Sequence, residues 1–564
     1  MKEQLNNLLK DIHFCLKMGP KACLLFIFLF FNVQVWAQNK EVGDDQIDVV
    51  KPYLPTLSDA FKISSSPEKD TLSFHIPEFK YVIPATRIPL NVEVVPIKAV
   101  KIKDEDQRPL TPGFFKLGLG NYNTPFIELF VNSSRSKNAM LSAHLSHLSA
   151  NNALLKNAGY SDYSKNHLAL DGKWFTASKE LLSASVNYDR NAVHYYGYQR
   201  SDTVNLSKDS TLHLFNGISV EAVLKNMVPK NKEARHEIRL NYHFLKDNLQ
   251  TNENRILVSG SLNKNFDKFN LGVLGAFNHS SISDRIGNTS RNLISLNPFI
   301  ENEKADLWKL HAGIRLLSVK DSASKIKVFP EINASYHLAD EYVIAFAGFE
   351  GDVQQNTFQS YAESNPFIRP VLKYTSTFNS VNVYGGFKGL ISPQMPYHIK
   401  VSYLESDHVP FFANAPSDKY LNTFMILYDN MTYLRANAEL GYFSQNQFSF
   451  RLNAGYFKCL SIAKLSKPIH IPEFDVTLSG FYRINADFTA RIHLKASGNQ
   501  YAWINKEPIL VKAWLDAGLG VDYSYSSKLT FFLNINNISN QSNYYWFNYP
   551  SQKLNVLAGL SYAF

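Results

Sequence analysis

Cysteine and charge are both scarce in this sequence. Only 3 of the 564 residues are cysteine, and 19% are charged. Cys15 and Cys23 lie within the first 37 residues, which leaves Cys459 alone in the remainder. A single cysteine cannot form an internal disulfide, so a disulfide framework is excluded for that part of the chain. We expect Cys459 to be a small strand residue.

Long apolar runs are also lacking after residue 38. The one run that stands out covers residues 22–31, follows Lys17 and Lys21, and is followed by residues 35–37, Val-Trp-Ala. A transmembrane helix needs about 20 apolar residues, so this run is too short to be one. A basic start, a short apolar run and a small residue at the cut are typical of a secretory signal peptide. We predict a signal peptide over residues 1–37, cleaved between Ala37 and Gln38.

Residues 38–112 differ from the rest of the chain in being rich in proline and charge. Lys51-Pro52-Tyr53-Leu54-Pro55 is one example. Such a composition predicts an extended N-terminal extension without a core of its own.

From Gly113 onward the sequence alternates between apolar and polar residues. Aromatic residues reach 13%, with 40 Phe and 30 Tyr, yet the mean hydropathy is −0.21. The alternation is clearest at the end of the chain, where the apolar positions are Leu554, Val556, Ala558, Leu560, Tyr562 and Phe564. Alternation over about ten residues matches a strand that crosses a bilayer at a tilt. Because no other long apolar run exists, a membrane location would require strands.

The expected connections alternate between short turns and long loops. Residues 485–487 and 526–528 read as tight turns, whereas 497–510 and 539–553 read as loops. Outer-membrane barrels have short periplasmic turns and long extracellular loops. We therefore predict an all-β fold: a transmembrane antiparallel β-barrel of about 22 strands (range 20–24) over residues 113–564. Its N- and C-termini would be periplasmic. A soluble β-sandwich would not need this many strands.

The register opposite the apolar one would face the barrel lumen, and it is rich in basic residues. The formal net charge of the chain is +9. The densest basic patch consists of Arg491, His493 and Lys495 on one strand, with Arg483 on its neighbour. Rings of basic residues favour anions in a pore. The alternative is that these charges pair with acidic residues and only keep the lumen hydrated.

Two aromatic clusters are predicted at loop tips, at 194–198 and 544–549. We expect them to form part of the aromatic girdle at the lipid headgroups. The alternative is a surface platform for a sugar, a peptide or a lipoprotein.

Signals for catalysis are weak. The sequence has no metal-spaced cluster, no Gly-x-Ser-x-Gly motif and no phosphate-binding loop. We expect no enzyme, no cofactor and no nucleic-acid partner.

The segment Phe531-Phe532-Leu533-Asn534-Ile535-Asn536-Asn537-Ile538 ends in two asparagines and a hydrophobic residue, and it resembles the penultimate strand of TonB-dependent receptors. The resemblance to that family covers the last 60 or so residues, and the whole barrel is similar in style to those of the Bacteroidota. The terminal strand, with Leu560, Tyr562 and Phe564, resembles the signal read by the barrel-assembly machinery. The resemblance implies a plug of well over a hundred residues before the barrel. Residues 38–112 are too few and too proline-rich for such a plug, so we expect a plugless barrel.

Two hypotheses follow for function. The first is a pore or transporter in outer-membrane lipid for small solutes, with a preference for anions. The second is a structural or assembly scaffold that binds envelope partners, such as a periplasmic or surface lipoprotein, through its extension and loops.

Overall fold

The computed structural model describes residues 112–133, 138–151, 159–198, 204, 206–227, 234–266, 268–302, 307–444 and 447–564. The predicted cleavage site at Ala37 and Gln38 and residues 38–111 of the predicted extension lie outside the described residues. All the described residues belong to one compact unit, Ile102–Phe564.

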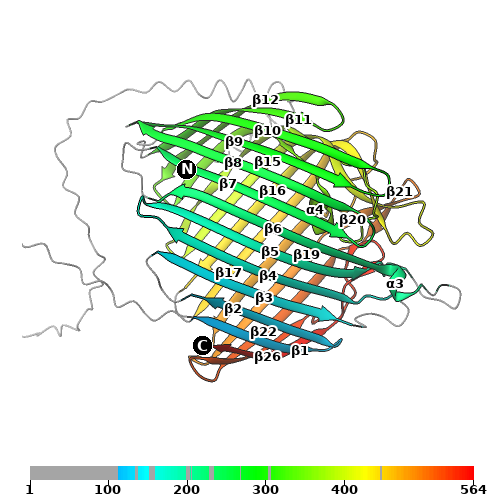
Figure 1. Cartoon of the computed structure of the whole chain (residues 1–564). Helices are drawn as coiled ribbons and strands as arrows, with labels where there is room; N and C mark the ends of the chain where they lie inside the picture. Colours follow the sequence, from blue (N-terminus) through cyan, green and yellow to red (C-terminus); the bar gives the residue numbers. More distant parts are fainter. Residues whose placement is uncertain are drawn as a thin grey trace, which may run out of the picture. The chain divides into compact units, whose positions relative to one another are not determined.

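This unit is a closed antiparallel β-barrel of 22 strands (Figure 1). Each strand pairs with its sequence neighbour in the barrel, and the first strand pairs with the last, which closes the ring. The predicted fold class and strand number are therefore confirmed. The barrel strands are β1 (Gly113–Gly120), β2 (Thr124–Asn132), β3 (Ala139–Ala150), β4 (Tyr163–Phe175), β5 (Glu180–His194), β6 (Leu212–Asn226), β7 (Arg235–Asp247), β8 (Asn252–Phe266), β9 (Phe269–Ser283), β10 (Asn288–Asn302), β11 (Trp308–Lys320), β12 (Ser324–Ala339), β13 (Val343–Gln354), β14 (Thr377–Ser392), β15 (Met395–Asn414), β16 (Phe424–Phe443), β17 (Phe448–Ile462), β18 (Phe474–Arg483), β19 (Phe488–Ser497), β22 (Trp514–Ser524), β23 (Leu529–Asn536) and β26 (Asn555–Ala563).

The remaining elements lie in the loops. Two small hairpins are formed by β20 (Gln500–Ile504) with β21 (Glu507–Val511), and by β24 (Tyr544–Trp546) with β25 (Tyr549–Pro550). Two short helices are α3 (Lys208–Thr211) and α4 (Phe358–Ser364). Neither of these helices, nor any other in the described part of the chain, has the length and apolar character to cross a membrane.

The two ends of the barrel differ in the length of their connections. At the end where β1 begins and β26 finishes, here called the terminal end, connections run from two residues (393–394) to eight (227–234). The opposite end, here called the loop end, has most of the long connections, including 195–211, 355–376 and 537–554. The predicted alternation of short turns and long loops holds from β15 to β26, whereas the loop-end connections 248–251, 284–287 and 321–323 are as short as those at the terminal end.

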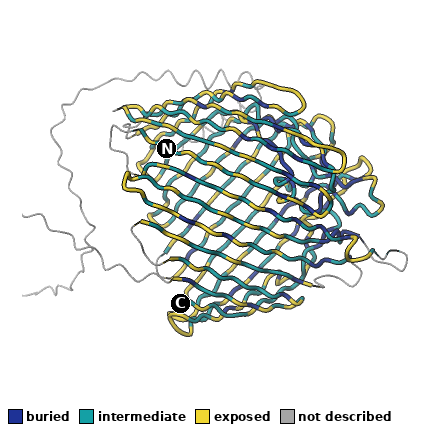
Figure 2. Tube along the Cα trace, in the orientation of Figure 1, coloured by how far each residue is buried: buried dark blue, intermediate teal, exposed yellow. Residues whose placement is uncertain are grey.

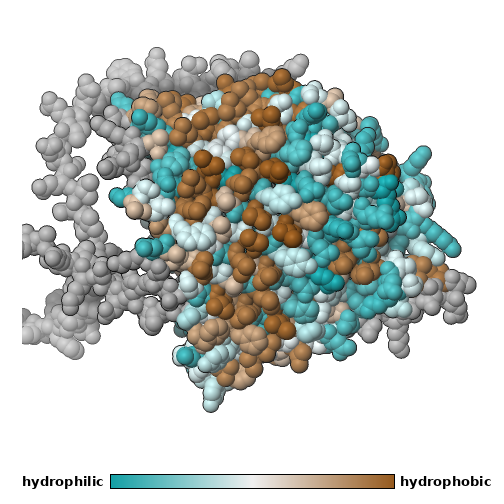
Figure 3. Space-filling model, in the orientation of Figure 1, coloured by the Kyte–Doolittle hydropathy of each residue, from teal (hydrophilic) through white to brown (hydrophobic). Residues whose placement is uncertain are grey.

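Apolar side chains of the outward register are exposed on the barrel wall. Leu119 is 75% exposed, Leu519 49% and Tyr562 42%. Figure 3 shows apolar residues spread over this wall and hydrophilic residues towards the loop end. An apolar belt of this kind suits contact with lipid. Buried residues gather instead at the loop end (Figure 2).

The closing strands β1 and β26 approach each other closely through two glycines. Gly118 lies opposite Gly559, and a Cβ added to Gly559 would lie 1.9 Å from the Leu117 carbonyl oxygen. Of the predicted terminal-strand residues, Leu560 pairs with Phe531 and Leu117, and Tyr562 pairs with Leu529 and Phe115. Phe564 follows β26, and its backbone N–H donates to the Gly113 carbonyl at 3.1 Å.

Candidate functional site in the barrel lumen

The lumen wall formed by β6 to β13 carries paired charges. Arg239 contacts Glu237 at 3.0 Å and Glu221 at 3.6 Å. Arg315 contacts Glu331 at 2.9 Å, and His311 Nδ1 lies 2.8 Å from Glu301. Several of these carboxylates were not predicted from the sequence to face the lumen, because the alternation of apolar and polar residues is clearest in the last strands. For Arg239, Arg315 and His311, the contacts agree with the alternative prediction of mutual charge pairing.

On the wall formed by β14 to β19, several cations lie over aromatic rings, as Lys325 and Lys327 of β12 lie over the Phe378 ring. The four pairs, with the distance from the cation to the ring centroid, are Lys400 and Tyr384 (3.8 Å), Lys495 and Tyr545 (5.1 Å), Lys388 and Phe346 (5.8 Å), and Arg451 and Phe443 (5.9 Å). None of these four cations forms an ion pair with any residue in the described part of the chain. A cation over a ring keeps its charge, so this wall is positive.

The predicted basic patch lies on the lumen face of β18 and β19, but its members have different surroundings. Arg491 pairs with Asp522 at 2.7 Å and donates to the Asn534 side-chain oxygen at 3.0 Å. His493 Nδ1 lies 2.9 Å from the Ser479 hydroxyl. Arg483 lies opposite Thr489, nearer the terminal end. The four residues therefore share a face without forming one site.

A recess of about 650 Å³ opens in the wall from β16 to β23. Arg491 and His493 line it, whereas Arg483 and Lys495 do not. Its polar lining also includes Ser479, Asn453, Asn534, Asn536 and Arg451. Gly518 and Gly520 occupy two inward positions of β22. Because glycine has no side chain, this part of the recess is not filled. The alternation of residues along β17 predicts that Arg451 faces the lumen. Its position in the recess depends on how β17 pairs with the neighbouring strands.

Two further cavities adjoin the recess. One, of about 470 Å³, shares Phe443, Arg451 and Asn453 with it. The other, of about 600 Å³, shares Asn536 with it and reaches Phe367 and Tyr196 at the loop end. The three cavities form a continuous series along one side of the lumen, ending beneath the loops.

Loop 355–376 folds inward and crosses the loop end of the lumen. Its α4 begins with a capping box between Thr357 and Ser360. Its Pro366 carbonyl lies 3.0 Å from His213 Nδ1 on β6, and its Thr375 N–H donates to the Tyr428 hydroxyl on β16 at 3.0 Å. Because β6 and β16 belong to different sides of the ring, the loop spans the barrel mouth. We call this loop the cap.

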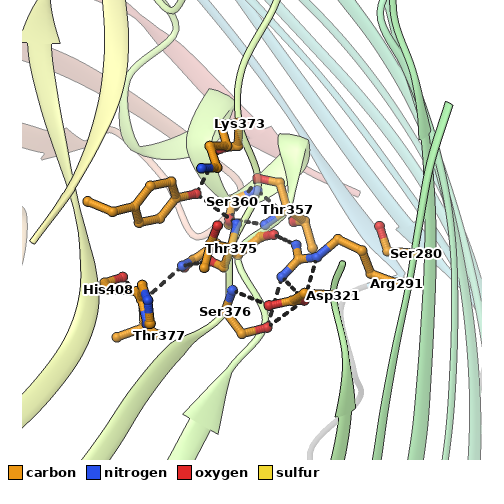
Figure 4. A network of polar contacts seen from close by, with 12 residues as sticks. Ser280, Arg291, Asp321, Thr357, Ser360, Lys373, Thr375, Ser376, Thr377 and His408 are labelled. Atoms are coloured by element: carbon orange, nitrogen blue, oxygen red, sulfur yellow. Dashed lines mark hydrogen bonds and ion pairs between the residues drawn. The ribbon is translucent and has the colours of Figure 1, made fainter. Parts of the chain in front are cut away.

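Buried polar contacts hold the cap against β8 and β10. Arg291 on β10 is fully buried, pairs with Asp321 at 2.7 Å, and donates to the Ser376 hydroxyl at 2.8 Å and to the Asn356 carbonyl (Figure 4). The Asp321 carboxylate accepts from the Ser376 N–H at 2.8 Å. Glu253 on β8, also fully buried, accepts from the Gln359 N–H at 2.8 Å. These bonds satisfy buried charges that would otherwise be costly.

Apolar packing completes the cap. Phe358 and Tyr361 of α4 pack against Phe215 on β6 and Ile282 on β9 in one buried cluster. The Tyr361 hydroxyl also lies 2.5 Å from the Tyr428 hydroxyl.

The two predicted aromatic clusters meet within this region. Phe367 stacks on Tyr549 with ring centroids 3.7 Å apart, and Tyr195 and Phe424 belong to the same buried cluster. Burial raises the pKa of Tyr549 well above its ordinary value. The expectation of a headgroup girdle is therefore wrong for Tyr195 and Tyr549, because long-range packing with the cap buries them.

His470, in the loop between β17 and β18, lies beside this cluster. Its ring centroid is 4.9 Å from that of Trp546 and 5.8 Å from that of Phe424. Both ring nitrogens are buried without a hydrogen-bond partner in the described part of the structure. Burial lowers the pKa of His470 to about 3.

Nothing in the described residues forms a metal centre. No group of three or more His, Cys, Asp or Glu side chains there is arranged to bind a metal ion. The arrangement instead provides a polar lumen with one positive wall, a recess in that wall, and a cap over the loop end.

Comparison of the sequence with protein-family models and with curated proteins finds no match. The fold, in contrast, is similar to several solved structures. The siderophore receptor PirA from Acinetobacter baumannii has a TM-score of 0.61 at 11% identity, with 80% of each chain covered. The ferric-catecholate import receptor Fiu from E. coli K12 has a TM-score of 0.61 at 12% identity, with 81% of this chain and 82% of that chain covered.

The pyoverdine outer membrane receptor FpvA from Pseudomonas aeruginosa PAO1 has a TM-score of 0.59 at 12% identity, with 81% of this chain and 79% of that chain covered. At these identities the likeness concerns the fold alone. The chain thus has the 22-strand barrel fold of the TonB-dependent outer-membrane siderophore receptors.

Proposed function

We propose that this chain is an outer-membrane transporter or pore that passes small anionic solutes through its lumen, with both barrel termini in the periplasm. The observation that supports this most is the positive wall formed by β14 to β19, where cations lie over aromatic rings instead of carboxylates. The exposed apolar belt and the fold likeness to outer-membrane receptors support the membrane location.

The charge asymmetry supports a preference for anions. Arg239 on β7 and Arg315 on β11 are paired with carboxylates, so their field is weak beyond their own pairs. Unpaired cations on the adjoining wall, β14 to β19, act together, and a low-dielectric wall concentrates their field in the lumen. Anions therefore gain more than cations from entering.

The cap determines when a solute can pass. Loop 355–376 crosses the loop end, so passage requires that it shift away from β8 and β10. In our proposal this movement takes the place of an energised plug, because residues 38–112 are too short and too proline-rich for one.

The test is the reversal potential of the purified, folded barrel in a planar bilayer under a tenfold KCl gradient. An ideal anion pore would approach about 59 mV, with the sign set by chloride. We expect the chloride sign, and a smaller value when Lys400 and Arg451 are both changed to Gln. A cation-selective current would contradict the proposal.

Two further parts of the proposal concern cleavage of the signal peptide and assembly of the barrel. We infer cleavage between Ala37 and Gln38, which mass spectrometry of the mature N-terminus tests. We also infer that Leu560, Tyr562 and Phe564 carry the signal read by the barrel-assembly machinery. Deleting Phe564 should then lower the folded amount in cells, with unchanged refolding from urea into detergent.

A scaffold is the second candidate, and the cap is the observation that favours it. A loop end held by buried ion pairs and aromatic packing suits a barrel that passes nothing. This candidate predicts a partner, such as a periplasmic or surface lipoprotein, that co-purifies with the full chain and is lost when residues 38–112 are removed. It also predicts no conductance in either form.

A further inference from the structure

The recess between β16 and β23 combines two rows of lumen-facing residues. Across the strands, one row runs from Phe443 through Ser449 and Phe481 to Arg491. The next row towards the loop end begins with Gly441 and continues through Arg451, Ser479 and His493. Aromatic rings therefore lie on the terminal-end side of the recess, and basic side chains lie directly beside them.

Arg451 and His493 are the cationic or donor groups in the recess that remain open to a ligand. Arg491, in contrast, has its charge paired with Asp522, and the same terminal nitrogen donates to Asn534. Arg451 makes no ion pair within the described residues, and its guanidinium lies 5.9 Å from the Phe443 ring centroid. The Ser479 hydroxyl lies 2.9 Å from His493 Nδ1, and in the tautomer in which the hydroxyl donates to Nδ1, Nε2 carries the hydrogen and can donate to a ligand.

The spacing of these two groups suits one small acid. Arg451 and His493 are separated by a single strand, β18, which places their Cα atoms roughly 10 Å apart. A carboxylate over Ser479 would lie between both side chains. Arginine binds carboxylates in a bidentate manner, which also fixes the orientation of the group.

Two phenyl rings are exposed on the same face. Phe443 is 46% exposed and Phe481 is 43% exposed, although both face the hydrated lumen. Between them lies Ser449, a small and buried residue, so the rings flank a gap one strand wide. An aromatic ring in that gap would cover apolar surface that water otherwise contacts.

We propose that this recess binds a small carboxylate that carries an aromatic ring, with Arg451 and His493 on the carboxylate and Phe443 and Phe481 beside the ring. The inference deepens the proposed function, on which it rests, by naming a solute class and the residues that select it.

The experiment uses the full, folded chain in detergent and measures binding by fluorine NMR. The probes are para-fluorobenzoate, its neutral isostere para-fluorobenzamide, and fluoroacetate, a carboxylate without a ring. The variants are Arg451→Gln and Phe481→Leu. Arg435→Gln is the matched control, because Arg435 is an exposed, lumen-facing arginine on β16 outside the recess.

We expect para-fluorobenzoate to bind and the other two probes to bind at least about tenfold more weakly. Arg451→Gln should weaken binding by about tenfold to a hundredfold, and Phe481→Leu by about threefold to tenfold. Arg435→Gln should leave it unchanged. Equal binding of the benzamide, equal binding by Arg451→Gln, or no binding by the unchanged protein would each overturn the inference.

Failure here can be told apart from failure of the proposed function. Anion-selective current without binding of para-fluorobenzoate would support the proposed pore and contradict only the proposed binding site. Binding without current would retain the site in a barrel that does not conduct.

Discussion

Replacing Arg291 with methionine should release the cap while leaving the barrel intact. Methionine keeps an apolar stem of similar length but loses the ion pair with Asp321 and the bonds to Ser376 and Asn356. Breaking a buried ion pair by removing one partner costs about 3–5 kcal/mol, because the other charge is left uncompensated. That cost shifts the equilibrium towards the released cap by at least about a hundredfold.

Limited trypsin digestion of the folded barrel measures this shift. The cap contains Lys373, whose carbonyl accepts a hydrogen bond from the Tyr428 hydroxyl. When opening is fast relative to cleavage, the cleavage rate follows the population of the open form. We expect cleavage after Lys373 to accelerate by about a hundredfold in Arg291→Met.

The control is Arg435→Met, which removes a lumen arginine that makes no ion pair in the described structure. It should be cleaved at the rate of the unchanged protein. Adding Asp321→Leu to Arg291→Met should restore part of the protection, because it removes the unpaired carboxylate. An unchanged cleavage rate in Arg291→Met, with the barrel still folded, would refute the role assigned to this contact.

Two more predictions concern the loop that contains His470 and the contact between β1 and β26. Because His470 keeps a pKa of about 3 when the loop between β17 and β18 is packed against Phe424 and Trp546, but an ordinary value near 6.5 when that loop is released, the stability of this packing is complete above about pH 6.5 and falls as the pH drops towards 3. At pH 5 the loss is about 2 kcal/mol, so trypsin cleavage should rise with acid, and His470→Phe should remove that rise. Gly559→Ala should prevent β1 from pairing with β26, because the added Cβ would lie 1.9 Å from the Leu117 carbonyl oxygen. Gly260→Ala, where the nearest atom is 3.7 Å away, should refold normally in the same urea titration.

The barrel could be predicted from the sequence because its determinants are local. A period of two and the alternation of short and long connections recur along the chain, and each can be read within a few residues. The closing strand is an example, since Leu560 and Tyr562 lie in the outward register as their spacing indicates.

The cap could not be predicted, because its contacts join distant parts of the chain. Arg291 donates to Asn356 and Ser376, which lie 65 and 85 positions further along the chain. The same holds for Tyr195 and Tyr549, which lie 354 positions apart and share one buried cluster. Nothing in the short segment around either tyrosine indicates that it will be buried.

The basic patch shows an intermediate case. Alternation placed Arg491 and His493 on one face, but the pairing of Arg491 with Asp522 depends on the register between β19 and β22. Arg451, which lies opposite Ser479 on the neighbouring strand, enters the recess for the same reason. Its importance follows from cross-strand pairing, which the order of residues along one strand does not reveal.

The central claim is that the lumen conducts and that the cap closes it. Single-channel recording in a planar bilayer tests it most directly, by comparing the unchanged protein with Arg291→Met and with Arg435→Met. We predict rare openings in the unchanged protein and in Arg435→Met, and frequent anion-selective openings in Arg291→Met. Silence in all three, with the released cap shown by cleavage after Lys373, would contradict the account and favour the scaffold.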